Sequence, residues 1–443
     1  MTETSLIQPR VAVVGGGLAG CEAAWQLAAA GLQVTLFEMK PEKFSPAHEQ
    51  EHLAELVCSN SFRSDDPLSA VGLLKEEMRR AGSLIMEAAA RTRVPAGRAL
   101  AVDRSLFGEW ITSSISQQSG IDVQRREIAG LDDPALTGFD RLILAAGPLA
   151  SDSLTRSLLE RIGQEDLYFY DAIAPIVRAD SLNWDKVFWG ARYEPESRDY
   201  LNCPLDEQEY HDFLQALLQA DTVRTRSFES LVHFEGCLPI ETMAERGEMT
   251  LAFGPMKPVG LTDPRTGKRP FAAVQLRAEN AAKTMFNLVG FQTKLTHPEQ
   301  KRVLRMIPGL EQAEFERLGS IHRNTFVNAP RVLKSDLVLK AAPGISLAGQ
   351  ITGVEGYVES AACGLWLGLN TAAELQGRRL GLPPQETALG GLLGHLQGGR
   401  DSFQPMNVTF GLLPPLGVKV KKAKRKQLYL DRARQAWQEW WPD

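Results

Sequence analysis

The chain has 443 residues, of which 44% are hydrophobic and 23% are charged, as in an ordinary soluble protein of two or three domains. Its net charge of -5 argues against a protein that coats nucleic acid over its whole surface, but it leaves room for a local basic patch. No apolar run reaches membrane-spanning length and no basic segment precedes the first one, so we expect a cytoplasmic protein without a membrane segment. The five cysteines, an odd and widely spaced set, should be free thiols.

Residues 10–38 have the pattern of a dinucleotide-binding unit. A β-branched run ends at a glycine-rich turn, an Ala-rich helix follows to Gly31, and a second apolar run ends at Glu38. The turn consists of Gly15, Gly16, Gly17, Leu18, Ala19 and Gly20. Its glycines permit a tight turn, a close approach of the backbone to a pyrophosphate and close packing of the helix, whose N-terminus attracts phosphate charge. Glu38 is placed to accept hydrogen bonds from an adenosine ribose and disfavours a 2'-phosphate, so the pattern predicts FAD or NAD.

The following stretch, residues 41–67, is polar and has no periodic pattern, which is typical of a functional loop. His48 to His52 matches the zinc-protease spacing HExxH, but Pro46 precedes it and no further histidine occurs before His211. We therefore predict no metal site. Cys58 lies in the segment ELVCSNS, and the residues alone leave open whether it is a buried structural thiol or a functional one.

The middle of the chain changes character twice. Apolar residues at spacings of three and four predict a helix from Leu68 to Ala90, and residues 141–148 predict a buried strand that ends at a glycine. From about residue 171 to residue 324 the strand–helix alternation is lost. We therefore expect an α/β fold, a Rossmann-like FAD-binding domain of the glutathione-reductase type in two parts, 1–170 and 325–443, with an inserted α+β domain at 171–324.

Two cysteines fall in the predicted insertion. Cys203 precedes a helix predicted at about 206–220, and we interpret it as a structural thiol. Cys237 follows Gly236 where an apolar run breaks, which indicates a thiol presented on a turn. From the residues alone, a functional and a structural role for Cys237 stay equally open.

The last third of the chain again has the pattern of strand, glycine-rich loop and helix seen at its start. A strand at 345–350 runs into a glycine-rich loop, and a helix follows at 359–375. This loop and helix start form a second site for negative charge, which next to a flavin would stabilise its anionic reduced form. Its predicted cofactor-binding residues are Gly349, Gln350, Gly353, Gly356 and Tyr357. No second GxGxxG occurs, so a nicotinamide nucleotide would act as a diffusible reductant.

The stretch from Lys419 to Lys426, KVKKAKRK, holds six basic residues in eight. It is either a solvated charged segment or a contact for the phosphate backbone of a nucleic acid. A short amphipathic helix is predicted after it, from Leu428 to Trp441.

Four segments together resemble the flavin- and methylenetetrahydrofolate-dependent tRNA (uracil-5) methyltransferases: the glycine turn, ELVCSNS, FEGCLPIE and LAGQITGVEGYVESAA. The resemblance covers nearly the whole chain. It implies FAD as cofactor, methylenetetrahydrofolate as carbon donor, NAD(P)H as reductant and the T arm of tRNA as substrate, methylated at uracil C5 to give ribothymidine. The larger flavoproteins that modify the wobble uridine of tRNA share the glycine turn and the AGQ segment, but they carry a long C-terminal helical extension.

The same resemblance implies that Cys237 is the nucleophile that adds to uracil C6 and that Cys58 is a second thiol near the flavin. Cys58 would either shield the reactive one-carbon group or move the C5 proton, and the sequence does not choose. Glu241 is a candidate base for a thiol but stays unassigned. Because the target base must be flipped out of a folded RNA, we expect the insertion and the basic stretch to line its approach. The alternatives are a shortened wobble-uridine enzyme, a small-molecule FAD oxidoreductase and a non-catalytic flavin-bound RNA-binding protein.

Overall fold

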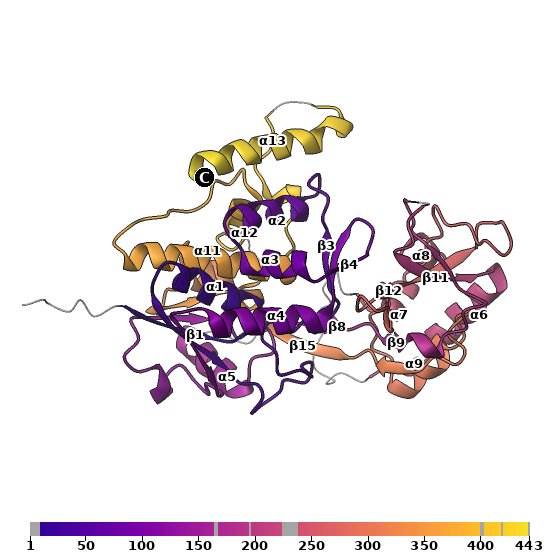
Figure 1. Ribbon diagram of the computed structural model, residues 1–443, viewed down its shortest axis with the longest axis horizontal. Coiled ribbons are helices and arrows are strands. Elements are labelled where there is room, and N and C mark those ends of the chain that lie inside the picture. The colour runs from indigo at the N-terminus through magenta and orange to yellow at the C-terminus, as the bar shows by residue number, and fades with distance from the viewer. Residues whose placement is uncertain are drawn as a thin grey trace, which may run out of the picture.

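The computed structural model describes residues 9–163, 167–194, 196–223, 238–398, 403–417 and 420–441; at 167–170, 323, 422 and 423 it describes the backbone only. Figure 1 shows two lobes side by side, one built on a mainly parallel sheet and the other on an antiparallel sheet. The chain begins in the first lobe, passes through the second and returns to the first.

The first lobe is organised around a six-stranded sheet. Its strands, in order across the sheet, are β16 (Val338–Leu339), β17 (Ala342–Leu347), β7 (Arg141–Leu144), β1 (Arg10–Val14), β2 (Gln33–Glu38) and β6 (Ile121–Arg125). All neighbours pair in parallel except β16 and β17. Because β2 and β7 flank β1, the carboxyl ends of these three strands meet at one edge, which is where open α/β sheets bind their ligands.

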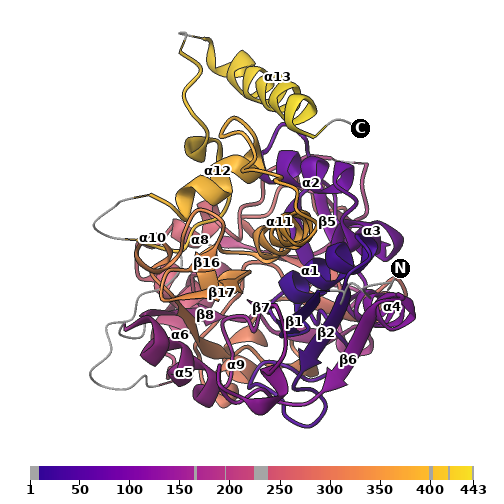
Figure 2. The same cartoon turned by 90° about the vertical axis from the view of Figure 1, so that its left-hand side faces the viewer.

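Two long helices cover one face of this sheet, α1 (Leu18–Ala29) and α11 (Tyr357–Leu375), and they lie against each other in Figure 2. Glycines permit this close approach. A Cβ atom on Gly364 would lie 2.1 Å from the carbonyl oxygen of Ala19, and one on Gly368 would lie 2.8 Å from that of Ala23. The predicted unit of strand, turn, helix and strand at 10–38 is confirmed, and the helix predicted at 359–375 begins two residues earlier.

The single helix predicted from Leu68 to Ala90 is wrong, because this segment forms α2 (Ala70–Arg80) and α3 (Leu84–Arg91). The break lies at Gly82, whose φ of +73° ends the first helix. The second helix is capped by Ser83 and by the buried carboxylate of Glu22, which accepts hydrogen bonds from the backbone N–H groups of residues 84 and 85. Apolar spacing continued across the break and concealed it.

The second lobe has its own six-stranded sheet and its own hydrophobic core. Its strands, in order across the sheet, are β10 (Phe188–Gly190), β11 (Tyr200–Leu205), β12 (Ala272–Ala278), β13 (Met285–Leu288), β9 (Ile176–Arg178) and β14 (Phe315–Arg317). Its helices are α6 (Glu207–Leu218), α7 (Ile240–Ala244), α8 (Thr250–Phe253) and α9 (His297–Leu304). The predicted helix at 206–220 is thus confirmed as α6, which begins at a capping box formed by Asp206 and Glu209.

Smaller elements join the lobes and complete the first one. Strands β8 (Leu167–Ala172) and β15 (Ile321–Phe326) pair antiparallel where the chain leaves and re-enters the first lobe. A three-stranded sheet contains β3 (Ser61–Ser64), β5 (Ala99–Val102) and β4 (Arg93–Val94). The other helices are α4 (Arg104–Gln117), α5 (Asp152–Ile162), α10 (Ala329–Val332), α12 (Ala388–His395) and α13 (Lys422–Trp440).

The predicted domain boundaries, 1–170, 171–324 and 325–443, stay a prediction; β8 and β15 lie at the two crossings between the lobes. The last helix is longer than predicted, since α13 already begins at Lys422 inside the basic stretch. Among the residues that the structure describes, no helix combines the length and the apolar character needed to cross a bilayer.

Candidate functional site

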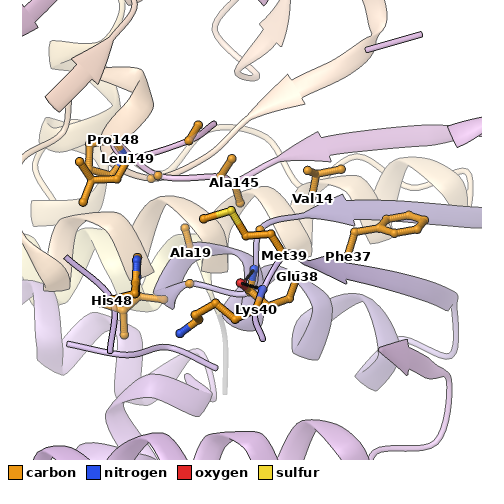
Figure 3. A pocket seen from close by; sticks show the side chains of 18 of the residues that line it. Val14, Ala19, Phe37, Glu38, Met39, Lys40, His48, Ala145, Pro148 and Leu149 are labelled. Carbon is orange, nitrogen blue, oxygen red and sulfur yellow. Dashed lines mark hydrogen bonds between the residues drawn. The ribbon is translucent and has the colours of Figure 1, made fainter. Parts of the chain in front are cut away.

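Two adjoining pockets lie at the carboxyl edge of the parallel sheet. The first, here called the glycine-turn pocket, is lined by the turn after β1, the end of β2 and the loop after β7 (Figure 3). The second, here called the Cys58 pocket, lies between the lobes and is lined by residues of both. The two pockets share Val57, Pro148, Leu149, Gln350 and Tyr357. The two pockets therefore adjoin at these residues, with the glycine turn in one and Cys58 in the other.

The glycine turn can be built only without side chains at three of its positions. Gly15 has a φ of +106°, and a Cβ atom there would lie 2.5 Å from the carbonyl oxygen of Ala145. A Cβ atom on Gly20 would lie 1.8 Å from the carbonyl oxygen of Gly15, and one on Gly16 would lie 2.8 Å from Oε2 of Glu38. Gly17 differs, since a Cβ atom there would meet no atom within 4 Å. Its missing side chain keeps open the space in front of the start of α1.

The N-terminus of α1 is suited to a diphosphate. Gly17 is its N-cap and supplies no side-chain hydrogen bond, and the first turn contains no acidic residue. The N–H groups at the helix start therefore have no side-chain cap, and the positive end of the helix dipole faces the glycine-turn pocket, which Gly17, Leu18 and Ala19 line.

Glu38 lines this pocket, but its carboxylate also holds the turn in place. Oε2 accepts a hydrogen bond from the N–H of Gly16 at 2.8 Å, and Oε1 accepts one from the N–H of Lys40 at 2.9 Å. The side chain points into the pocket in Figure 3. A carboxylate has about four lone-pair positions, so these two contacts leave it able to accept hydrogen bonds from a ribose.

A buried ion pair next to the glycine-turn pocket was not identified from the sequence. Nζ of Lys40 lies 2.9 Å from Oε2 of Glu55, and the two side chains are 3% and 4% exposed. Lys40 also donates to the carbonyl oxygen of His52 at 2.7 Å. The pair thus ties the irregular loop at 48–55 to the end of β2. The segment from His48 to His52 is not helical, so its HExxH spacing does not place both imidazoles on one helix face.

Cys58 is partly exposed in the second pocket, and a residue far along the chain positions it. The hydroxyl oxygen of Tyr357, at the start of α11, accepts hydrogen bonds from the N–H of Cys58 at 2.8 Å and from that of Ser59 at 3.3 Å. Burial raises the pKa of the Tyr357 hydroxyl, so it is neutral at physiological pH. The structure therefore brings together two residues predicted from separate segments, at the junction of the two pockets.

The second glycine-rich loop and the first turn of α11 each contribute one buried carboxyl group to this region. Glu355 accepts a hydrogen bond from Nε2 of Gln350 at 2.8 Å, and burial, together with the nearby Asp171, raises its pKa well above the usual range. Glu359 accepts hydrogen bonds from the guanidinium of Arg63 and, at 2.8 Å, from the N–H of Val408. Gly349, Gly353 and Gly356 all have positive φ values, between +81° and +102°, which allow the loop to bend tightly around the pocket.

Contacts between the lobes hold the Cys58 loop from the other side. Nε of Arg277, on β12, donates to Oδ1 of Asn60 at 2.8 Å, while Nδ2 of Asn60 donates to the carbonyl oxygens of Val102 and Ala278. Arg317 donates to the carbonyl oxygen of Val57 at 3.0 Å. Sequence reasoning did not identify Arg277, although an arginine within the mostly apolar run AAVQLRA at 272–278 was the available signal.

Cys237 lies outside the described residues, so its predicted role stays a prediction. The chain resumes at Leu238, and the N–H of Ile240 donates to the carbonyl oxygen of Gln292 at 2.7 Å. Gln292 lines the Cys58 pocket. Glu241, the unassigned candidate base, is buried and accepts hydrogen bonds from Thr293 and from the N–H of Lys294, contacts that favour a structural role.

The other described cysteines are free thiols in packed interiors. Burial raises the pKa of Cys21 and of Cys203, and it raises the pKa of Cys363 to about 11. Cys203 lies in the core of the second lobe, as a structural thiol should. Of the four described cysteines, Cys58 is the one that opens into a pocket.

Comparisons with known proteins extend over nearly the whole chain. The model of the family described as glucose inhibited division protein A, GIDA, matches residues 10–379. The methylenetetrahydrofolate--tRNA-(uracil-5-)-methyltransferase TrmFO of Oleidesulfovibrio alaskensis is 61% identical over 97% of this chain and 96% of its own. The protein of the same name from Geobacter sulfurreducens is 58% identical over 96% of both chains.

Among solved structures, two crystal forms of Aquifex aeolicus GidA align with TM-scores of 0.69 and 0.67 at 15% identity. They cover 98% and 97% of this chain and 74% and 76% of the GidA chains. At this identity the likeness shows the fold, and it confirms the predicted α/β class with a Rossmann-type nucleotide-binding domain.

Proposed function

The chain belongs to the GidA family and, within it, to the methylenetetrahydrofolate--tRNA-(uracil-5-)-methyltransferases, and from this we propose that it methylates C5 of the T-loop uridine of tRNA. FAD is its bound cofactor, methylenetetrahydrofolate its carbon donor and NAD(P)H its reductant. The observation that carries the proposal is that the two pockets adjoin and share Tyr357 as a wall residue, with the glycine turn in one and Cys58 in the other.

The residues present fit FAD. The open space at Gly17 and the uncapped start of α1 suit the diphosphate, Glu38 suits the adenosine ribose, and the loop from Gly349 to Tyr357 suits the flavin end. When bound, FAD supplies the redox chemistry by which a one-carbon group from folate becomes a methyl group. A ligand that reached from the glycine turn past Tyr357 would place its far end beside Cys58.

Uracil C5 is a weak nucleophile and needs activation by the protein. In the proposed reaction the thiolate of Cys237 forms a bond to C6, and the electron pair of the C5–C6 double bond moves to give an enolate whose C5 is nucleophilic. After C5 has gained its new carbon, the C5 proton leaves with a base, and expulsion of the thiolate from C6 restores the ring. The hydrogen bond between Ile240 and Gln292 supports this role, because it holds the continuation of the Cys237 segment at the pocket wall.

Cys58 is proposed to act on the other side of the reacting group. Tyr357 fixes its backbone, and its partly exposed thiol lies in the pocket, where it either shields the one-carbon group or accepts the C5 proton. Glu355 lines the same pocket, where burial and the nearby Asp171 raise its pKa well above the usual range, and we propose that it donates a hydrogen bond toward substrate.

The direct test is product formation. The purified protein is incubated with methylenetetrahydrofolate, NADPH and an unmodified tRNA transcript, and ribothymidine is measured by mass spectrometry of the nucleosides. We expect product from folate and none when S-adenosylmethionine replaces it. Cys237→Ser and Cys58→Ser should each lose activity by at least about a hundredfold, whereas Cys203→Ala, which alters a thiol buried in the second-lobe core, should retain it. Activity in both serine variants would overturn the assignment of the thiols, and absence of ribothymidine with the wild type would overturn the function.

A further inference from the structure

The last helix, α13, packs against the first lobe through one face only. Leu430, Ala433 and Trp437 lie at helical spacing and are 3%, 0% and 1% exposed against the main core. A charged contact and a stacking contact add to this attachment. The guanidinium of Arg434 donates two hydrogen bonds to the carboxylate of Glu76, at 2.8 and 2.7 Å, and the ring of Tyr429 stacks on Phe410 with centroids 5.3 Å apart. These contacts hold α13 firmly from Tyr429 to its end.

The two turns before Tyr429 have a different character. Lys421, Lys424, Arg425 and Lys426 are exposed, as is Gln427. Within the part of the chain that the structure describes, none of these four cations lies within ion-pair distance of a carboxylate. Lys419 lies outside the described residues, and for Lys422 only the backbone is described. In Figures 1 and 2, α13 lies at the edge of the molecule above α2 and α12.

The basic residues at the start of α13 do not stabilise the helix. The start of an α-helix is the positive end of its dipole, where acidic residues stabilise and basic residues destabilise. The first turn of α13 contains no acidic residue and no side-chain cap. In a protein with a net charge of -5, a cluster of cations at this helix end therefore adds positive potential where folding gains nothing from it.

We propose that residues 421–426, here called the basic arm, are a second contact for tRNA, which bind its phosphate backbone apart from the uridine that is methylated. The proposal rests on the proposed function, which names tRNA as the partner. Uncompensated cations on an anchored helix match the chemistry of RNA phosphates, and rigid attachment lowers the entropy that is lost when the arm binds.

A membrane surface fits the basic arm less well than RNA does. A basic helix that binds an anionic bilayer inserts an apolar face into it. In α13 the apolar residues Leu430, Ala433 and Trp437 are already buried against the protein. Among the described side chains of residues 421–428, those that remain exposed are charged or polar apart from Leu428, which is 37% exposed.

The test is the salt dependence of tRNA binding by the full-length protein. Four substitutions are combined, Lys421→Gln, Lys424→Gln, Arg425→Gln and Lys426→Gln, and the Kd for an unmodified tRNA transcript is measured between about 50 and 200 mM salt. Each phosphate contact contributes about 0.7 to 0.9 to the slope of log Kd against log salt, so the loss of four cations should lower the slope by about 3 and raise the Kd at low salt at least tenfold. Because phosphates carry no sequence information, the same factor should apply to a transcript whose target uridine is replaced by cytidine.

Two control variants test whether a change in the salt slope comes from the basic arm or from the overall charge of the protein. In the first, Arg156, Arg331, Lys334 and Arg379 are changed to Gln; these four are exposed cations on other segments, so the same charge is removed elsewhere. In the second, Lys421, Lys424 and Lys426 are changed to Arg, which preserves the charge of the arm. Both should keep the wild-type slope. With saturating tRNA, the arm variant should retain the wild-type kcat for methylation, because the arm is apart from the reacting groups, while kcat/KM falls.

The outcomes distinguish this inference from the proposed function. If the wild type forms ribothymidine but the arm variant keeps the wild-type salt slope, the arm is not an RNA contact. The same conclusion holds if the first control variant lowers the slope equally, or if the arm supports binding to phosphatidylserine vesicles while tRNA affinity is unchanged. If the wild type forms no ribothymidine, the proposed function fails instead, whatever the slope shows.

Discussion

The walls of the two pockets are made of different parts of the chain. The glycine-turn pocket takes its shape mainly from the main chain of the strand–turn–helix–strand unit and of the loop after β7, and Gly15, Gly16 and Gly20 of the turn have no room for a Cβ atom. The Cys58 pocket takes its shape from side chains of distant segments: Tyr357 holds a loop 299 residues earlier, and Arg277 reaches Asn60 across 217 positions. A Cβ atom added to the glycine turn should therefore disrupt flavin binding in the first pocket. This binding should not depend on pH. The Cys58 pocket should instead be sensitive to substitution of its side chains and to changes in their protonation state.

The largest effect is expected from Gly15→Ala. The new methyl group would lie 2.5 Å from the carbonyl oxygen of Ala145, at a φ of +106° that alanine rarely adopts. Overpacking and the backbone strain together should lower the free energy of unfolding by about 3 kcal/mol or more. Flavin content after purification, read from visible absorbance, should fall to near zero. Gly344→Ala is the matched control, because no atom lies within 4 Å of its added Cβ; a Gly15→Ala protein with full flavin would contradict the main-chain origin of this pocket.

A smaller loss of stability is expected from Asn60→Ala. Asn60 is fully buried, and its removal leaves the guanidinium of Arg277 buried without its side-chain acceptor. We expect a loss of about 2 to 4 kcal/mol in urea unfolding, with flavin content retained, since the glycine turn is untouched.

Two variants check that this loss comes from the buried contact. Asn60→Asp keeps the acceptor for Arg277 but loses the donor to the carbonyl oxygens of Val102 and Ala278, so it should recover only part of the lost stability. Gln208→Ala removes an exposed hydrogen bond to Asp212 within α6 and should cost less than about 0.5 kcal/mol. If Asn60→Ala released the flavin as readily as Gly15→Ala, the two pockets would not be independent.

The same contrast explains how much the sequence predicted. The glycine turn, α1 and Glu38 were predicted because each depends on neighbours within 30 residues, and both the glycine spacing and the apolar periodicity are visible in the chain. Tyr357 was selected as part of the second glycine-rich loop, and the place of Cys58 near the flavin came from the resemblance, but nothing in their spacing indicated that the tyrosine hydroxyl binds the cysteine N–H.

Contacts that depend on tertiary packing were missed. The Lys40–Glu55 pair lies in a loop without periodicity, and Arg277 meets Asn60 only because the second lobe folds against the first. The break between α2 and α3 was missed because apolar spacing continues across Gly82 and Ser83, the two local signals of a helix end and a helix start. The part that Glu22 plays in capping the second helix, from 61 residues before Ser83, has no local signature.

A third prediction concerns the junction of the pockets. Tyr357→Phe removes the acceptor of the Cys58 and Ser59 N–H groups while it keeps the ring, so we expect a loss of about 1 to 2 kcal/mol in stability. Flavin content should be retained, and kcat for methylation should fall at least tenfold because the loop that carries the Cys58 thiol is no longer held. Tyr193→Phe, at a side chain 60% exposed on the second lobe, is the control and should behave as the wild type. Unchanged kcat in Tyr357→Phe would mean that the position of Cys58 does not depend on this contact.

The smallest effect is a pH dependence that should come from the Cys58 pocket. His322 lines it, and burial, together with the charges of Arg317 and His48, lowers its pKa from 6.5 to about 4. Between these values the unfolded chain binds a proton that the folded protein does not, so the free energy of unfolding should fall as the pH is lowered from 6.5 toward 4. In His322→Gln this contribution should be absent, and urea unfolding at pH 7 and pH 4.5 measures the difference. His297→Gln, at an exposed histidine at the start of α9, should keep the wild-type pH dependence. If His322→Gln destabilises the protein equally at both pH values, the histidine contributes packing and a hydrogen bond to Ser320 but no titration, and the wall of the Cys58 pocket is less sensitive to protonation than its side chains indicate.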